Sequence, residues 1–254
     1  MVAPTSLKEA PPRSITLRDR EHIASSQYVE LIDHLRECGY GFNDKKSLGI
    51  TSSVSGEGVT TIACNLALHL AFFTDCRVIL VDANYSSPRL HQIFGIGSKP
   101  GLADLFAETA MESECIHDLA NNNSGTLPRG LRRRIKRLSS NSNSPLLSRR
   151  APSSIDLAVL PAGETNQETA PSSATRYDFI ETVQSEFDMV IVDLPPMLSQ
   201  AQHSVNLGSL DGTLFVIQAE QTTDQATRKS LQAIQHRGGE LAGVVLNRCR
   251  RRFL

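Results

Sequence analysis

The chain has 254 residues, 40% of them hydrophobic, with 26 basic and 27 acidic residues and a net charge of −1. This length fits one large domain, and the near-neutral charge excludes a global attraction to nucleic acid or to membrane. The absence of tryptophan argues against a base-stacking surface, and five scattered cysteines without metal-ligand spacing fit reduced thiols better than disulfides or zinc.

Residues 1–20 hold prolines among charged residues, a composition that predicts a disordered leader. For residues 21–254 we expect a single domain, which opens with an amphipathic helix at residues 21–38 that ends at Gly39. The sequence has no run of 18 apolar residues and no start that resembles a signal peptide. We therefore expect a cytoplasmic protein that associates with a membrane only through a partner.

Residues 48–73 have the order of a phosphate-binding loop. A buried strand is predicted for residues 48–53, a tight glycine-containing turn for residues 54–58, and a helix from Val59 onward. Glycines let backbone N–H groups converge on an anion, and the N-terminus of a helix adds a positive dipole. The pattern therefore predicts a phosphate ligand. The alternative is a plain strand-to-helix turn of similar appearance.

Two positions of this loop depart from the usual pattern G-x-x-x-x-G-K-[ST]. Ser53 takes the place of the first glycine, Gly58 is the second, and Thr60 supplies the hydroxyl. Val59 stands where the pattern has its lysine. A charge-assisted hydrogen bond is worth about 1.5–3 kcal/mol, so its loss should weaken nucleotide binding by about one to two orders of magnitude.

Two later strands are predicted to end in a carboxylate. The apolar runs at residues 77–82 and 189–193 close with Asp82 and Asp193. Such runs are typical of buried parallel strands, whose carboxyl ends collect the ligand chemistry of open α/β sheets. Further strands and helices alternate along the chain, with strands at 155–160, 213–218 and 242–247 and helices at 176–186 and 223–235. The alternation predicts an α/β fold, a doubly wound and mostly parallel sheet flanked by helices.

These pieces together predict a nucleotide site at one edge of the sheet. The backbone that would hold the phosphates is that of Ser55, Gly56, Glu57, Gly58, Val59 and Thr60. Thr61 would contact a phosphate, the Thr60 hydroxyl would bind Mg²⁺, and Asp193 would hold a magnesium-bound water. Asp82 would contribute to the metal shell or accept a proton as a catalytic residue. The alternative for each acid is a strand-end carboxylate that caps a neighbouring helix.

The segment 121–150 differs in composition from the rest of the chain. It has no Asp or Glu, eight Lys or Arg, and many Ser and Asn. We interpret it as a basic, disordered insertion. It could bind an anionic partner, such as a phospholipid, an acidic polysaccharide or nucleic acid, or it could be a solvated insertion without a partner. A short basic run alone favours the second interpretation.

Six segments occur in an order that resembles a known family: ITSSVSGEGVTTIACNLALHLA, VILVDANYSSPRLHQIFGI, GLADLF, LAVLPAGE, FDMVIVDLPP and GVVLNR. They resemble the cytoplasmic domain of the bacterial tyrosine kinases, P-loop autokinases of capsule and exopolysaccharide synthesis that are related to the MinD/ParA ATPases. The resemblance covers about residues 25–249. It implies a Walker A loop at residues 53–61, the Walker B acid at Asp193, the first acid of a second Walker motif at Asp82, and an adenine contact at Asn247. The alternative for Asn247 is a turn residue after a strand, with no contact to a ligand.

The resemblance also implies a cofactor and partners. The cofactor would be Mg–ATP or Mg–ADP. The partner would be a membrane protein of the chain-length or polysaccharide co-polymerase type, or an active kinase homologue, and the resemblance allows for a homo-oligomer. Because the membrane-spanning domain that is fused to many members does not occur in the sequence, we expect the stand-alone form.

Several departures from the family pattern predict a loss of catalysis. Val59 replaces the Walker lysine, Asn84 the second acid of a D-x-D motif, and Ser86 a usual arginine. Residues 26–38 lack a clear E-x-x-R-x-x-R pattern, and no tyrosine follows Tyr177. These losses predict a regulatory pseudokinase that binds nucleotide weakly or not at all. The alternatives are an active P-loop ATPase or tyrosine kinase that works without the lysine, and a MinD/ParA-like positioning ATPase.

Overall fold

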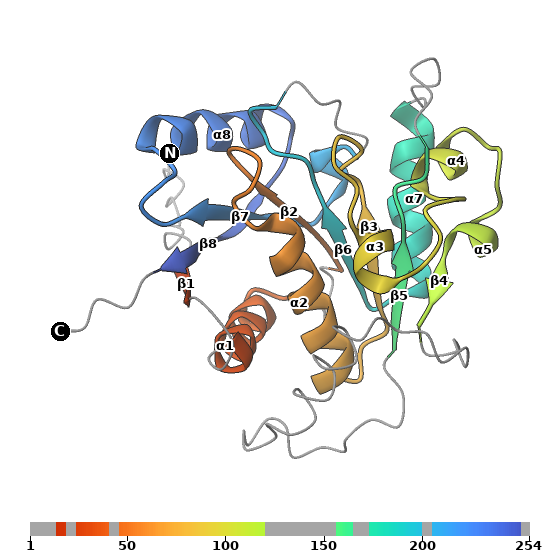
Figure 1. Ribbon diagram of the computed structural model, residues 1–254, viewed down its shortest axis with the longest axis horizontal. Coiled ribbons are helices and arrows are strands. Elements are labelled where there is room, and N and C mark those ends of the chain that lie inside the picture. Colours follow the sequence, from red (N-terminus) through yellow and green to blue (C-terminus); the bar gives the residue numbers. More distant parts are fainter. Residues whose placement is uncertain are drawn as a thin grey trace, which may run out of the picture.

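An eight-stranded sheet forms the centre of the computed structural model (Figure 1), which describes residues 14–18, 24–40, 46–119, 156–164, 173–199 and 205–249. The spatial order of the strands is β1-β8-β7-β2-β6-β3-β5-β4, and every pairing is parallel except that of β4 with β5. The strands are β1 (Ser14–Arg18), β2 (Ser47–Ser52), β3 (Val78–Asp82), β4 (His117–Asp118), β5 (Leu157–Leu160), β6 (Met189–Asp193), β7 (Gly212–Gln218) and β8 (Leu241–Cys249).

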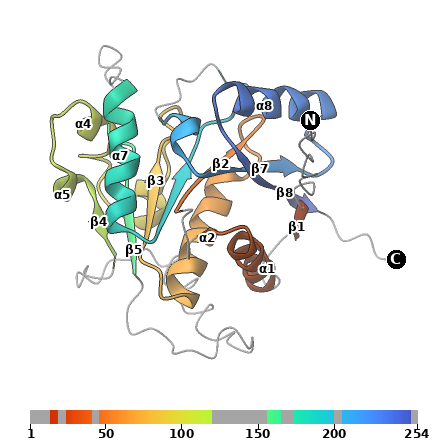
Figure 2. The same ribbon diagram turned by 180° about the vertical axis from the view of Figure 1, so that it is seen from behind.

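Helices cover both faces of this sheet, because successive side chains of β3 are buried on opposite faces. Val78 and Leu80 pack into one buried cluster, whereas Ile79 and Val81 pack into the other. The first cluster includes side chains of α1 and α2, which lie side by side in both views, and the second includes side chains of α7 and α8 (Figures 1 and 2). The helices are α1 (Ala24–Glu37), α2 (Val59–Phe73), α3 (Leu90–Phe94), α4 (Leu102–Phe106), α5 (Glu112–Cys115), α7 (Ser173–Glu186) and α8 (Asp224–His236), with one 3-10 turn, η2 (Leu207–Ser209).

The predicted α/β fold with a mostly parallel sheet is confirmed, and the topology places the candidate site. Strand β2 lies between β7 and β6, and β6 lies between β2 and β3. In the register of these strands, Asp193 is the partner of Ile50 on one side and of Asp82 on the other. The loop after β2 and the two acid-tipped strands therefore meet at the carboxyl edge of the sheet, where open α/β sheets bind their ligands.

One prediction about the N-terminal region is wrong. Residues 14–18 form strand β1, which pairs with β8 in parallel, whereas the composition predicts a disordered leader there. The reason is a weak local signal, because Ile15 and Leu17 alternate with polar residues over only five positions next to several prolines. Within the described ranges, no helix combines the length and the hydropathy of a membrane span. The basic segment 121–150 lies outside the described residues.

Candidate phosphate-binding site

The loop between β2 and α2 has the glycine geometry that a phosphate-binding loop needs. Gly56 has φ 92°, and Gly58, the N-cap of α2, has φ 100° and ψ 17°. L-residues with a side chain rarely adopt this left-handed conformation. A Cβ atom built on Gly58 would also lie 2.2 Å from Nδ2 of Asn247, whereas one on Gly56 would meet nothing within 4 Å. The loop therefore requires glycine at position 58 for two independent reasons.

The side chain of Glu57 fixes the loop from the inside. Glu57 is 3% exposed, and its Oε2 accepts a hydrogen bond of 2.9 Å from the backbone N–H of Val54. Its Oε1 accepts a hydrogen bond from the hydroxyl of Thr222, which in turn accepts one from the backbone N–H of Gln218 at 2.9 Å. The loop is thus tied to the end of β7. The sequence predicts a backbone role for Glu57 but not this side-chain contact.

Asn247 lies against the same loop. Its Nδ2 donates a 2.8 Å hydrogen bond to the backbone carbonyl of Glu57, and its Oδ1 accepts a 2.9 Å bond from the backbone N–H of Arg248. Both polar atoms of the amide therefore bond to protein backbone. The contact with adenine that the resemblance implies stays a prediction, and the structure adds a loop-bracing role that sequence reasoning missed.

Asp82 caps the segment that leads into α3. Its Oδ2 accepts hydrogen bonds from the backbone N–H groups of Arg89 at 2.9 Å and Leu90 at 3.0 Å, and its Oδ1 accepts a weaker one from Asn84 at 3.2 Å. Burial raises the pKa of the Asp82 carboxyl, and these three hydrogen bonds act in the opposite direction. This geometry matches the capping interpretation of Asp82, so its predicted catalytic and metal-binding roles have no separate support from its contacts.

Asp193 is the least satisfied acid of the site. It is 1% exposed, and among the described residues its Oδ1 has no hydrogen-bond partner. Burial, together with the neighbouring Asp82 carboxylate, raises the pKa of Asp193 to about 8, although a hydrogen bond with the Thr60 side chain lowers it. An acid in this state is protonated at neutral pH, and a cation beside it would lower its pKa and favour the ionised form.

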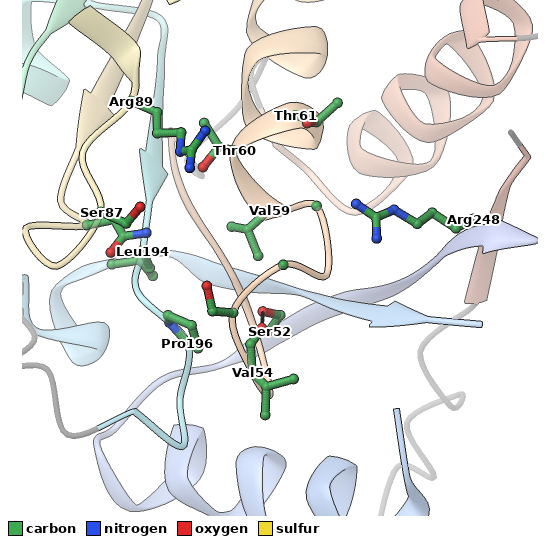
Figure 3. Close-up of a pocket in the computed structure, with 14 residues that line it drawn as sticks. Ser52, Val54, Val59, Thr60, Thr61, Ser87, Arg89, Leu194, Pro196 and Arg248 are labelled. Carbon is green, nitrogen blue, oxygen red and sulfur yellow. Dashed lines mark hydrogen bonds between the residues drawn. The ribbon is translucent and has the colours of Figure 1, made fainter. Parts of the chain in front are cut away.

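A pocket of about 300 Å³ opens over the loop (Figure 3). Its lining contains six of the predicted phosphate-site residues and two unpredicted arginines, Arg89 and Arg248. The lining residues are Ser52, Val54, Ser55, Gly56, Gly58, Val59, Thr60, Thr61, Asn84, Ser87, Arg89, Leu194, Pro196 and Arg248. Glu57, Asp82, Asp193 and Asn247 are not part of this lining, but each has a hydrogen bond with a residue of it. Sequence reasoning missed the arginines because neither occupies a position of the phosphate-loop pattern, although both lie within segments that carry the resemblance.

Sequence comparisons relate the chain to proteins of known families. No protein-family profile matches the chain. The putative tyrosine-protein kinase EpsB of Ralstonia solanacearum is 27% identical over 198 residues, which cover 78% of this chain and 22% of EpsB. Tyrosine-protein kinase YwqD of Bacillus subtilis is 26% identical over 233 residues, which cover 92% of this chain and 84% of YwqD. The chain is therefore a homologue of bacterial tyrosine kinases.

Solved structures give the same fold. The kinase domain of Escherichia coli tyrosine kinase ETK superposes with a TM-score of 0.71 at 18% identity, covering 100% of the kinase homologue and 97% of that chain. The septum site-determining protein MinD of Pyrococcus horikoshii, in complex with Mg–ADP, superposes with a TM-score of 0.56 at 17% identity, covering 80% and 70%. The kinase homologue thus has the fold of the P-loop ATPases. It spans about a fifth of the length of EpsB.

The residues of the kinase homologue fit a magnesium–phosphate group in all but one respect. The two left-handed glycines and the N-terminus of the 15-residue helix α2 suit an anion, and the oxygen atoms of Thr60 and Asp193 are ligands of the kind that Mg²⁺ prefers. Val59, however, is only 9% exposed and packs into the core cluster beneath the loop. The helix therefore carries no cation at the position where the usual motif has its lysine.

Proposed function

We propose that the kinase homologue is a regulatory pseudokinase of exopolysaccharide or capsule synthesis, a tyrosine-kinase-like P-loop protein that binds Mg–ATP or Mg–ADP weakly or not at all. The observation that carries this proposal is the apolar, core-packed Val59 at the head of α2, over a pocket that otherwise keeps the form of a phosphate site. A lysine at this position would meet the phosphates with its charge, and a valine offers them only a hydrocarbon surface.

Two further substitutions, Asn84 in the lining of the pocket and Ser86 two residues after it, point the same way. The resemblance places an acid at position 84 and an arginine at position 86, where this chain has Asn84 and Ser86. The hydroxyl of Ser86 donates a 2.8 Å hydrogen bond to Oδ1 of Asn84. An uncharged pair thus occupies the place of two charged groups. Neither residue can act as a general base or stabilise negative charge as strongly as the residues that it replaces.

If nucleotide binds, the roles of the residues follow from their positions. The backbone of residues 55–60 would hold the phosphates, Thr61 would contact one of them, and the Thr60 hydroxyl and Asp193 would hold the metal. Bound Mg–ATP would supply a transferable phosphoryl group. Asp193 would first have to lose its proton, because burial raises its pKa to about 8. This proton loss is a further cost to binding at neutral pH.

The partner follows from the resemblance. The proposed partner is a membrane protein of the polysaccharide co-polymerase type, or an active kinase homologue, and the protein would reach the membrane through it from the cytoplasm. A homo-oligomer is compatible with the same role. The basic segment 121–150 is a second proposed contact, with eight Lys or Arg that suit an anionic surface.

Substitution of Val59 tests the proposal. Val59→Lys should raise the affinity for Mg–ADP by about ten- to a hundredfold, which corresponds to one charge-assisted hydrogen bond to phosphate. Val59→Met is the matched control, because it adds length without charge and should leave the affinity unchanged. Thr60→Ala in the Val59→Lys background should remove much of the gain. The measurement is calorimetric titration with Mg–ADP.

Two outcomes would contradict the proposal. Stoichiometric phosphotyrosine on the unmodified protein after incubation with Mg–ATP, detected by mass spectrometry, would establish an active kinase. Steady ATP hydrolysis by the unmodified protein would establish an active P-loop ATPase. An unchanged Mg–ADP affinity in a folded Val59→Lys variant would instead mean that the likeness to a nucleotide site is one of scaffold alone.

A further inference from the structure

Two arginine side chains flank the head of α2 from opposite sides (Figure 3). Arg89 comes from the loop after β3 and points toward Thr60, and Arg248 comes from the end of β8 and points toward the loop that ends at Gly58. Both are exposed and both line the pocket. The pocket therefore has positive charge at its rim, although α2 supplies none at its floor.

The backbone holds Arg248 in an uncommon conformation. Arg248 has φ 59°, in the left-handed region that residues other than glycine seldom occupy. The Oδ1 of Asn247 accepts a hydrogen bond from its backbone N–H, while the Nδ2 of the same side chain bonds to the loop at Glu57. The Nη1 of Arg248 donates a 2.9 Å hydrogen bond to Oε1 of Gln218. The backbone of Arg248 is thus linked to the phosphate loop through Asn247, and its guanidinium is held by Gln218 at the end of β7.

The backbone of Arg89 is also hydrogen-bonded to a residue of the site. Its backbone N–H donates a 2.9 Å hydrogen bond to Asp82, the acid at the end of β3. Among the described residues, the ion pairs of the chain join Arg77 to Asp156 and Lys99 to Glu164, and neither pocket arginine pairs with a carboxylate there. The charge of both guanidiniums is therefore available to an anionic ligand from the pocket.

We propose that Arg89 and Arg248 form a two-arginine phosphate clamp that binds the phosphate chain of a nucleoside diphosphate or of pyrophosphate. The clamp replaces, from the loop after β3 and from the end of β8, the charge that Val59 does not supply. A guanidinium offers five N–H donors in a planar fork that matches two phosphate oxygens at once. This inference rests on the proposed function, because it assigns the residual phosphate affinity of the pseudokinase pocket to these two side chains.

Neutral substitutions test the clamp. We expect Arg89→Gln and Arg248→Gln each to weaken the binding of Mg–pyrophosphate by about tenfold, as the loss of a charge-assisted hydrogen bond predicts. The double substitution should abolish detectable binding and Arg248→Lys should keep part of it. The matched control is Arg228→Gln, which removes an exposed arginine of α8 outside the pocket and should change nothing. The measurement is calorimetric titration at two salt concentrations, with thermal unfolding to confirm that each variant is folded.

Binding of Mg–pyrophosphate that is equal in the unmodified protein and the folded double variant would overturn the clamp. An unmodified protein that fails to bind Mg–pyrophosphate at millimolar concentration would overturn it as well. In the Val59→Lys background, the effect of each arginine should be smaller, because the new ammonium would share the same phosphates. The pseudokinase proposal stands or fails on phosphotyrosine formation and ATP turnover, so the two proposals can fail separately.

Discussion

Asp193 gives the sharpest test of the geometry of the site, because its buried carboxyl couples stability to pH. In the folded protein its pKa is about 8, against an ordinary value of 3.8. Between these two pH values the folded state keeps a proton that the unfolded chain has lost. The free energy of unfolding therefore falls as pH rises through this window, because the folded state binds more protons than the unfolded chain. The substitution Asp193→Asn removes the ionisation and keeps an oxygen that can accept a hydrogen bond from Thr60.

The size of the effect follows from the shift in pKa. Each unit corresponds to about 1.36 kcal/mol. Between pH 5 and pH 8 the parent protein should lose about 4 kcal/mol of stability through Asp193, and little more above pH 8. The asparagine introduced in the variant cannot ionise, so the stability of the variant should lack this component. For a chain of this size, about 4 kcal/mol corresponds to roughly 10 °C in Tm.

Thermal unfolding of the parent and of Asp193→Asn between pH 5 and pH 9 measures this difference. We expect the Tm of the variant to exceed that of the parent by about 10 °C more at pH 9 than at pH 5. Asp75→Asn is the control, because it removes an exposed carboxylate far from the sheet edge and should leave the difference constant. A Tm difference between parent and Asp193→Asn that does not change with pH would show that burial and the Asp82 carboxylate do not raise the pKa of Asp193.

Two further predictions follow from the loop and the acid. Gly56→Ala should lower the free energy of unfolding by about 1–2 kcal/mol through backbone strain alone. Gly58→Ala should lower it clearly more, because its Cβ would lie 2.2 Å from Asn247. Equal losses for the two variants in chemical denaturation would contradict the role of Asn247. The affinity for Mg–ADP should rise by about tenfold between pH 7 and pH 8.5 as Asp193 loses its proton, and Asp193→Asn should remove this rise. Titration calorimetry at several pH values measures the affinity of both proteins. The same dependence of affinity on pH in the variant would exclude Asp193 as the group responsible.

The fold could be predicted from sequence because its signals are local. Strands β3 and β6 are apolar runs that end in an acid, and residues of β3 that are neighbours in sequence pack into opposite clusters of the core. Glycine residues with positive φ mark the predicted turn before α2. Strand β1 could not be predicted in the same way, because it depends on pairing with β8 at the far end of the chain. A five-residue edge strand carries too little pattern to overcome the prolines beside it.

The candidate site could be predicted only as far as its motif extends. The loop residues and the two acids carry a recognisable spacing, and the sheet brings them together. Arg89 and Arg248 have no such spacing, since Arg89 reaches the pocket from the residue before α3 and Arg248 from the end of β8. The bond between Thr222 and Glu57 is likewise a product of strand order, with β7 next to β2. A sequence motif reveals residues whose spacing along the chain is characteristic. It does not reveal residues that only the fold brings to the same pocket.

The retained motif residues differ in what their retention implies. Gly58, Glu57, Asp82 and Asn247 each have a contact that the fold itself needs, whether or not a nucleotide binds. A protein that had lost its ligand would still keep them for stability. Thr61, Arg89 and Arg248 are different, because their side chains are exposed at the pocket and their loss would cost the core nothing. The degree to which this pocket still serves a phosphate ligand must therefore be judged on these exposed residues, because the buried ones would look the same in a bare scaffold.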